Sequence, residues 1–323
     1  MIYQIQPNHA DHISYYKDKY LNEMFEKEMC CAQLKYDGER MLIHIDEGKV
    51  YCTSRRISKK TGQFMENQER IPVVNELFKP LMTLGYTVID CECYSKDWST
   101  VAGILHSLPE RAIELQKENE VKFACFDCLF YDGQDLRDEK YITRLSKLGT
   151  LLDMIDNPQA HLVKFISDNK IENETFKQVE SIDDTSKMMN FAIDAGFEGI
   201  VVKSLERKYY DKGASLKCKK FETLDVVVCG YQQGRGKYAD TIGALEIGYY
   251  DKETDSIIKI SKVNCGTDDE RNFWRDNWST LKNSVIEVKC QEITSKSLRH
   301  PVYIRRRDDK EYTMCTKETI FEN

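Results

Sequence analysis

The chain has 323 residues, of which 41% are hydrophobic and 31% are charged, and its formal net charge is −7. This length accommodates one large domain and one small one, with the composition of an ordinary soluble globular protein. No apolar run is long enough to span a membrane, and the N-terminus lacks a basic segment followed by an apolar one, so we expect neither membrane insertion nor secretion. The twelve cysteines lie scattered through expected strands, which favours reduced, buried thiols in an intracellular compartment and no metal–thiolate site.

The first two thirds of the chain predict a mixture of helices and strands. Ile13, Tyr16, Tyr20 and Met24 recur at helical spacing, so we expect a helix within residues 8–28. A β-hairpin is expected over residues 41–53, with its turn at residues 46–48. The later elements expected in chain order are a helix over 73–84, strands over 87–93 and 122–130, helices over 145–154 and 183–195, and a strand over 199–203.

After Phe221 the pattern changes to short β-rich runs with one helical segment over residues 268–278. Five short strands and a single helix in about a hundred residues fit a small barrel of the OB type. We therefore assign the chain to the α+β class, with a first domain of residues 1–222 and an OB-fold domain of residues 223–323. The strands expected in the second domain are 226–231, 244–250, 257–263, 285–290 and 302–306.

The hexapeptide Lys35-Tyr36-Asp37-Gly38-Glu39-Arg40 lies between two apolar stretches. A lysine at a strand end, followed by Asp-Gly, presents its amine on a sharp turn. There the amine can attack the α-phosphate of a nucleotide and hold the nucleotide as a phosphoramidate. Asp-Gly between apolar runs is also a common hairpin turn, so the hexapeptide alone does not decide the function.

Nucleotidyl transfer also needs a surface for the base, carboxylates for Mg²⁺ and cations for the phosphates. Each candidate alone has a plainer explanation, as a core aromatic residue, a strand-end carboxylate or a solvated lysine. Their order behind Lys35 favours the catalytic interpretation. The candidates are Ser54-Arg55 for a phosphate, Glu92 for the ribose, Phe126 for stacking on adenine, Glu198 for Mg²⁺, and Lys217 with Lys219 on one face of a strand.

Taken together, these segments resemble a nucleotide-dependent DNA ligase of the covalent nucleotidyltransferase superfamily, and the architecture is similar to viral and phage ligases. The resemblance spans residues 35–310 and includes a C-terminal signature. The matching segments are Lys35–Arg40, Ser54-Arg55, Asp90-Cys91-Glu92, Phe126-Asp127, Glu198–Lys203, Leu216–Lys220, and Ser297–Lys310, which carries Arg299-His300-Pro301 and Arg305-Arg306-Arg307-Asp308-Asp309-Lys310.

The resemblance implies an adenylation domain of antiparallel sheets with flanking helices, followed by the OB-fold barrel. It also implies ATP-dependent sealing of 3′-OH/5′-phosphate nicks in duplex DNA through lysyl-AMP and DNA-adenylate, in replication, repair and recombination. Mg²⁺ would assist, with Mn²⁺ able to substitute. The resemblance implies that Lys35 carries AMP, that Phe126 stacks on adenine and that Glu92 contacts the ribose. It implies that Lys217 and Lys219 bind the α-phosphate and that Glu92 and Glu198 bind the metal ion. The nick ends would be contacted by Asp37, Arg40 and Arg55, and the leaving pyrophosphate would be oriented by Arg305, Arg307, Asp309 and Lys310.

Two departures from the family pattern stand out. Cys91 replaces the usual glycine between the acidic pair, and the segment Gln232–Thr241 is shorter than the DNA-clamping loop of some minimal viral ligases. ATP is favoured over NAD⁺ because only 34 residues precede Lys35 and a four-cysteine zinc module is absent. We expect a monomer and find no obvious motif for a protein partner. The alternatives are an RNA ligase, a GTP-dependent mRNA capping guanylyltransferase, and a catalytically dead nucleic-acid-binding module.

Overall fold

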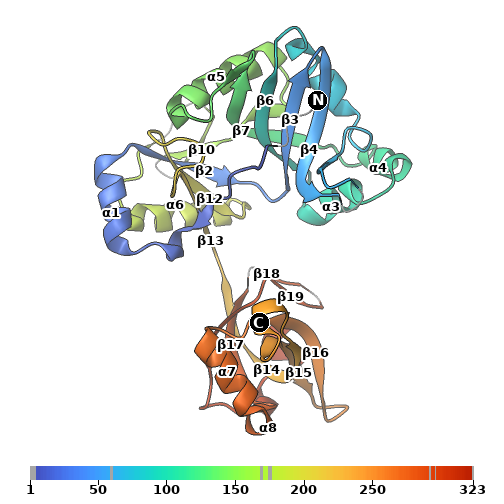
Figure 1. The fold of residues 1–323 in the computed structure, drawn as a ribbon, viewed down its shortest axis with the longest axis vertical. Helices are drawn as coiled ribbons and strands as arrows, with labels where there is room; N and C mark the ends of the chain where they lie inside the picture. The colour runs from blue at the N-terminus through green and yellow to red at the C-terminus, as the bar shows by residue number, and fades with distance from the viewer. Residues whose placement is uncertain are drawn as a thin grey trace. The chain divides into compact units, whose positions relative to one another are not determined.

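The computed structural model describes residues 5–58, 61–167, 170–173, 177–290, 292–294 and 296–321. The chain forms two compact units, Met1–Lys219 and Lys220–Asn323 (Figure 1). Both units combine helices with sheets in which nearly all neighbouring strands are antiparallel, so the expected mixed α/β character is confirmed. Within the described residues, every helix is too short or too polar to cross a lipid bilayer.

One sheet of the first unit is built around the predicted hairpin, which is confirmed as β3 (Glu39–Asp46) and β4 (Lys49–Ile57). Alternate side chains of β3, namely Met41, Ile43 and Ile45, face the core under helices α2, α3, α4 and α5. The remaining elements of this layer are β5 (Phe64–Glu66), α2 (Val73–Leu77), β6 (Thr87–Tyr94), α3 (Trp98–Leu105), α4 (Pro109–Gln116), β7 (Lys122–Tyr131), β8 (Gln134–Asp135), α5 (Tyr141–Ile155) and β9 (Ala160–Leu162).

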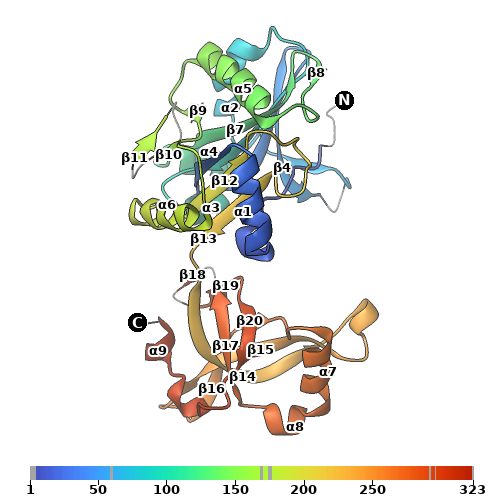
Figure 2. The same cartoon turned by 90° about the vertical axis from the view of Figure 1, so that its left-hand side faces the viewer.

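The second sheet of this unit contains the first described strand of the chain, β1 (Asp11–His12). Its strand order is β1-β13-β12-β2-β10-β11, and helices α1 (Asp18–Lys27) and α6 (Ile182–Asp194) pack on its apolar face (Figure 2). Since β2 lies in this sheet and β3 in the other, the short link of residues 36–38 joins the two sheets. The strands are β1 (Asp11–His12), β2 (Cys30–Lys35), β10 (Phe165–Ser167), β11 (Lys170–Glu172), β12 (Gly199–Ser204) and β13 (Ser215–Lys219).

Two predicted helices are shorter in the structure than expected, and two further helices were not predicted. The helix expected within residues 8–28 is reduced to α1, because Asp11 and His12 form a parallel pair with β13 and Lys17 has extended backbone angles. The helix expected over 73–84 stops at Leu77, and a 3₁₀ turn over Lys79–Leu81 follows with Pro80 in it. Helices α3 and α4 were not predicted, although Asp97 caps the first and Pro109 opens the second.

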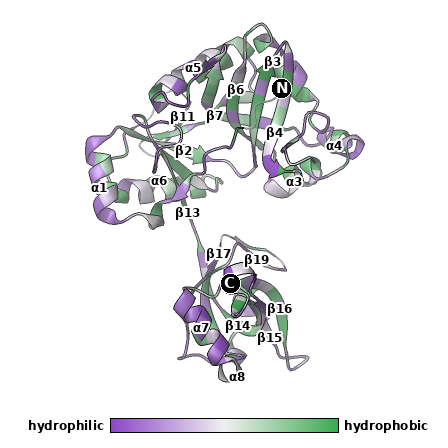
Figure 3. Cartoon of the chain, in the orientation of Figure 1, coloured by the Kyte–Doolittle hydropathy of each residue, from purple (hydrophilic) through white to green (hydrophobic). Residues whose placement is uncertain are grey.

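The second unit contains all five of the predicted strands, in the order β16-β15-β14-β17-β20. The predicted helix is present as α7 (Asp268–Asp276), which Thr267 and Glu270 close with a capping box. Figure 3 shows α7 largely hydrophilic and β15 largely hydrophobic, as expected for a helix over a buried sheet face. The other elements are β14 (Glu222–Gln233), β15 (Ile242–Asp251), β16 (Ser256–Val263), α8 (Trp278–Leu281), β17 (Val285–Cys290), β18 (Glu292–Ile293), β19 (Leu298–Arg299), β20 (Val302–Arg306) and α9 (Lys317–Phe321).

The cysteines all lie in the described part of the chain, where each is a free thiol. Eleven of them are buried and only Cys229 is partly exposed. Burial raises the pKa of Cys30, Cys52 and Cys218 to about 12. Burial therefore keeps these thiols protonated and unreactive in the folded protein.

Two glycines allow backbones to approach closely beside Lys35. A Cβ at Gly38 would lie 2.2 Å from the carbonyl oxygen of Cys93, and a Cβ at Gly199 would lie 2.2 Å from that of Cys218. Gly199 also has a φ of +143°, which side chains rarely adopt. Both positions therefore exclude any larger residue without a shift of the neighbouring strand.

We predict that Gly199→Ala lowers the free energy of unfolding by about 2 kcal/mol or more, because the added methyl group overpacks a backbone contact. Urea denaturation measures this change. Gly103→Ala is the matched control, since Gly103 lies in α3 with no atom within 4 Å of the added Cβ, and it should leave stability equal or slightly higher. Equal effects of the two substitutions would contradict the proposed close approach.

Candidate functional site

Lys35 is the last residue of β2 and belongs to a three-strand register whose middle residue is Gly199. Gly199 of β12 pairs with Lys35 on one side and with Lys219 of β13 on the other. The backbone N–H of Glu198 donates to the carbonyl oxygen of Lys35 at 3.2 Å. This register brings two predicted lysines and the predicted metal carboxylate together at the end of one sheet.

The carboxylate of Glu198 lies between the two lysines. It forms an ion pair with the ammonium of Lys35 and accepts from Lys219 Nζ at 3.1 Å. Burial alone would raise the pKa of Glu198, but the charges and hydrogen bonds of Lys35 and Lys219 outweigh burial and lower it. Glu198 is therefore ionised and neutralises part of the positive charge at this position.

Lys217 lies two residues before Lys219 on β13, so its side chain is on the same face of the strand. Burial lowers the pKa of Lys217, and the charge of Lys35 lowers it further. Burial also lowers the pKa of Lys219. The predicted phosphate-binding lysines thus belong to one cluster of cations around Glu198, which would attract a polyphosphate.

The link between the sheets fixes the residues that follow Lys35. The ring of Tyr36 packs against Tyr94, Phe197 and His161, with centroid distances of 4.7, 5.4 and 5.8 Å. Asp37 follows at the turn and is partly buried. The packing of Tyr36 anchors the turn, so Lys35 extends from a fixed backbone.

Arg40 lies across the ladder from Glu92 and points into the protein. Its guanidinium donates to both oxygens of Asp90, at 2.8 and 2.5 Å, and to the hydroxyl of Tyr209 at 2.9 Å. Asp90 is fully buried, and this bidentate pair compensates its charge. We expect Arg40 to contact a nick end. Its guanidinium would do so while it remains hydrogen-bonded to Asp90.

Phe126 of β7 is the predicted adenine platform. The guanidinium of Arg40 lies 5.2 Å from the ring centroid and the ammonium of Lys203 lies 4.7 Å from it. The carbonyl oxygen of Phe126 accepts from Lys203 Nζ at 3.2 Å and from the Tyr141 hydroxyl at 2.7 Å. Cation–π contacts and two hydrogen bonds thus fix both the ring and its backbone.

Next to Phe126 lies a buried polar network that was not predicted from the sequence. Arg144 donates to both oxygens of Asp127, at 2.7 and 3.0 Å, and Lys203 Nζ lies 3.8 Å from the same carboxylate. Burial lowers the pKa of Lys203 to about 8, with Asp127 opposing the shift. Asp127 and Lys203 lie inside segments that resemble the family, Phe126-Asp127 and Glu198–Lys203. Their place in these segments was the sequence feature that could have pointed to the network.

Glu92 and Arg55 complete the predicted set within this unit. Burial raises the pKa of the Glu92 carboxyl group to about 7, and the carboxylate of Glu198 adds to the rise. The cations Lys35, Arg40 and Arg55 oppose it. Arg55 is exposed, and its Nη1 lies 3.4 Å from His9 Nδ1.

The carboxylates offer a partial set of metal ligands. Among the described residues, no three His, Cys, Asp or Glu side chains gather at ligand distance. The charge of Glu198 raises the pKa of Glu92, and a cation bound by both carboxylates would oppose that effect. Two protein carboxylates are enough to bind Mg²⁺ when phosphate oxygens of the nucleotide and water molecules supply the other ligands of its coordination shell.

The C-terminal cations belong to the second unit and have acidic partners there. Arg305 donates to Glu287 at 2.5 Å. Arg307 forms ion pairs with Asp225 at 3.1 Å and Asp309 at 2.8 Å. Lys310 also forms an ion pair with Asp225. The predicted residues Arg305, Arg307, Asp309 and Lys310 thus form one cluster.

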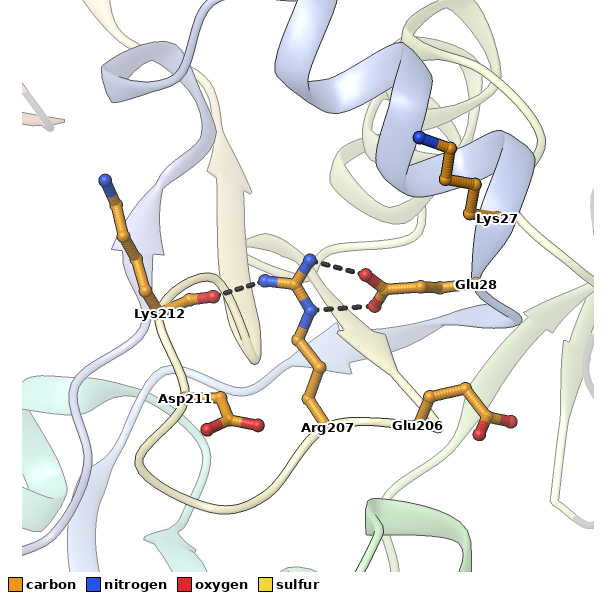
Figure 4. Close-up of a pocket in the computed structure, with 6 residues that line it drawn as sticks. All are labelled: Lys27, Glu28, Glu206, Arg207, Asp211 and Lys212. Atoms are coloured by element: carbon orange, nitrogen blue, oxygen red, sulfur yellow. Dashed lines mark hydrogen bonds and ion pairs between the residues drawn. The ribbon is translucent and has the colours of Figure 1, made fainter.

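A separate pocket of the first unit contains none of the predicted site residues (Figure 4). Its central guanidinium, from Arg207, donates to both oxygens of Glu28 at 2.7 and 2.6 Å and to the carbonyl of Lys212. The carboxylate of Glu28 neutralises this arginine, so the pocket gives no support to a second phosphate site. The lining residues are Lys27, Glu28, Glu206, Arg207, Asp211 and Lys212.

Comparison with known proteins identifies similar sequences. Residues 10–220 match the family described as ATP dependent DNA ligase domain. DNA ligase 2 of Korarchaeum cryptofilum is 30% identical over 257 residues, covering 74% of this chain and 40% of that protein. The DNA ligase of Caldivirga maquilingensis is 28% identical over 284 residues, covering 82% of this chain and 43% of that protein. This chain therefore spans less than half the length of these curated relatives.

Solved structures also resemble this chain. One, titled "DNA binding with a minimal scaffold: Structure-function analysis of Lig E DNA ligases", superposes with a TM-score of 0.63 at 15% identity, covering 94% of this chain and 99% of that chain. This similarity supports a nucleotidyltransferase-type ligase fold of mixed α/β content with antiparallel sheets.

We predict that Glu92→Gln raises the free energy of unfolding above pH 7 by about 2 kcal/mol. Because the folded pKa of Glu92 is near 7 and the ordinary value is 4.5, the protonated carboxyl group favours folding below pH 4.5. That stability is lost as the pH rises through 7. Denaturation of both proteins from pH 4 to 8 measures the difference, which should shrink towards pH 4. A constant difference would show that the charge of Glu92 is not the cause.

Proposed function

Because this chain belongs to the ATP-dependent DNA ligase family, we propose that it seals 3′-OH/5′-phosphate nicks in duplex DNA, using ATP and a covalent lysyl-AMP intermediate. The observation that carries the proposal is the register that places Lys35, Glu198 and Lys219 together beside Lys217. An amine with cations around it and an aromatic platform in the same unit is the arrangement that nucleotidyl transfer requires.

In the first step, the ammonium of Lys35 loses a proton to solvent and its nitrogen attacks the α-phosphorus of ATP. A nitrogen–phosphorus bond forms, the bond from phosphorus to pyrophosphate breaks, and pyrophosphate leaves with the electron pair. Lys217 and Lys219 would neutralise charge on the α-phosphate, while Phe126 stacks on adenine. Asp37 would remain at the turn for the DNA steps.

In the second step, an oxygen of the nick's 5′-phosphate attacks the same phosphorus, and the bond to Lys35 breaks. In the third step, the 3′-hydroxyl loses its proton to solvent and its oxygen bonds to the phosphorus of the 5′-phosphate. The bond from that phosphorus to the oxygen of AMP breaks, and AMP leaves with the electron pair. Asp37, Arg40 and Arg55 would contact the nick ends, and Glu92 would contact the ribose. Charge neutralisation by these side chains lowers the barrier of each transfer.

Glu92 and Glu198 would hold a divalent cation, Mg²⁺ with Mn²⁺ able to substitute. When bound, the ion supplies neutralisation of phosphate charge. The side chain of Glu198 pairs with Lys35 in the structure, so this carboxylate lies beside the amine that reacts in the first step.

The two domains would divide the work. Residues 1–222 would form the adenylation domain, and residues 223–323 would form the OB-fold barrel, whose residues Arg305, Arg307, Asp309 and Lys310 orient the leaving pyrophosphate. The enzyme would act as a monomer on nicked duplex DNA inside the cell, in replication, repair or recombination. The five-stranded sheet of the second unit with helix α7 supports the OB assignment.

We predict that Lys35→Ala abolishes both self-adenylation and the sealing of nicks, because no other side chain carries the nucleotide. Mass spectrometry after incubation with ATP and Mg²⁺ should show one added AMP on the wild-type protein and none on the variant. Parallel incubations with NAD⁺ and GTP, and nicks with RNA strands, test the alternative activities. Wild-type protein that never gains an adenylate would refute the proposed function.

We also predict that Arg305→Ala and Lys310→Ala slow self-adenylation by about tenfold or more while leaving the sealing of pre-adenylated nicks within about twofold, because pyrophosphate leaves only in the first step. Gel assays on ordinary and pre-adenylated nicks separate the two activities. Equal losses in both assays would assign these side chains to DNA contact instead.

A further inference from the structure

The C-terminal cations of the second unit do not stand alone. Their three acidic partners are Glu287, Asp309 and Asp225. Among the described acids of this cluster, Asp225 forms ion pairs with two of the cations, Arg307 and Lys310. Asp225 is not part of the C-terminal signature segment Ser297–Lys310. It lies in β14, much earlier in the sequence.

Asp225 is more buried than Asp309 and belongs to a strand. It lies inside β14 and pairs across the ladder with Glu287 of β17, which pairs in turn with Arg305 of β20. The side chain of Asp225 is 15% exposed, whereas that of Asp309, in the turn after β20, is 64% exposed. A strand carboxylate with little exposure gives a fixed reference point for flexible side chains around it.

The geometry divides the donors of Arg307 between the two acids. Nε and Nη2 donate to Asp309 at 2.9 and 2.8 Å, while Nη1 donates to both oxygens of Asp225 at 3.2 and 3.1 Å. The backbone N–H of Lys310 also donates to the carbonyl of Arg307, which closes the turn. Asp225 therefore sets the spacing of two like charges that would otherwise repel each other.

We propose that Asp225 is a positioning residue, which holds Arg307 and Lys310 as a paired-cation site for the polyphosphate tail of the nucleotide. The inference rests on the proposed function and adds to it a carboxylate that orients the leaving-group cations. A preorganised pair of cations stabilises developing charge without reorganising during the reaction. Without Asp225, the two side chains lose their common anchor and separate.

Asp225→Asn tests the proposal, since it keeps the shape of the side chain and removes its charge. We expect self-adenylation at saturating ATP to slow by about tenfold or more, because small misplacements of positioned groups are costly. Sealing of pre-adenylated nicks should stay within about twofold of wild type. Asp225→Glu should recover part of the lost rate.

Glu246→Gln is the matched control, because it removes another barrel ion pair, Glu246–Lys259 at 2.5 Å, outside the cluster. It should leave both rates unchanged. A double-mutant cycle of Asp225→Asn with Lys310→Met shows whether Asp225 acts through the cation: the double variant should be no slower than the slower single variant.

The outcomes separate the inference from the function on which it rests. Wild-type protein that gains no adenylate would refute the proposed function. A wild-type protein that is adenylated, together with an Asp225→Asn variant that reacts at the same rate, would overturn the inference alone. Additive effects in the cycle, or equal losses in both assays with a lowered melting temperature, would also overturn it by showing a structural role.

Discussion

The arrangement of the candidate site depends on how closely three backbones approach one another at Gly199. That residue pairs with Lys35 on one side and Lys219 on the other, and a Cβ there would collide with the carbonyl of Cys218. Strand pairing, rather than a flexible loop, therefore sets the distance between the two lysines. Because Glu198 immediately precedes Gly199, the same constraint places a carboxylate between the two ammonium groups. Sheet hydrogen bonds thus provide the preorganisation that charge stabilisation needs.

Charges of opposite sign alternate through both clusters of the protein. In the first unit Glu198 offsets the repulsion between Lys35 and Lys219, and Asp90 compensates Arg40. In the second unit Asp225 bridges Arg307 and Lys310. Buried charges of one sign would destabilise the fold, so each cluster includes its own counter-charges. The ligand phosphates of the proposed reaction would enter sites whose cations are already positioned.

Sequence reasoning succeeded where a pattern is local. The hairpin over residues 41–53, the strand ending at Lys203 and the five strands after Phe221 follow from alternation and turn residues. It failed where distant segments decide the conformation: His12 joins β13 instead of extending a helix, and Asp90 and Arg144 are buried through partners far along the chain. Periodicity carries no information about such partners. The grouping of Lys35, Glu198 and Lys219 could be expected from motif order, but their common register could not.

The burial of the cysteines gives the chain a built-in reporter of unfolding. Thiolates react with alkylating agents, and burial keeps most of these thiols protonated and out of reach of the reagent. Only Cys229 is partly accessible in the folded state. Labelling of Cys30 or Cys52 would report opening of the first unit, and labelling of Cys265 or Cys290 opening of the second. Alkylation followed by peptide mapping could therefore time the loss of structure in each unit separately, without any introduced probe.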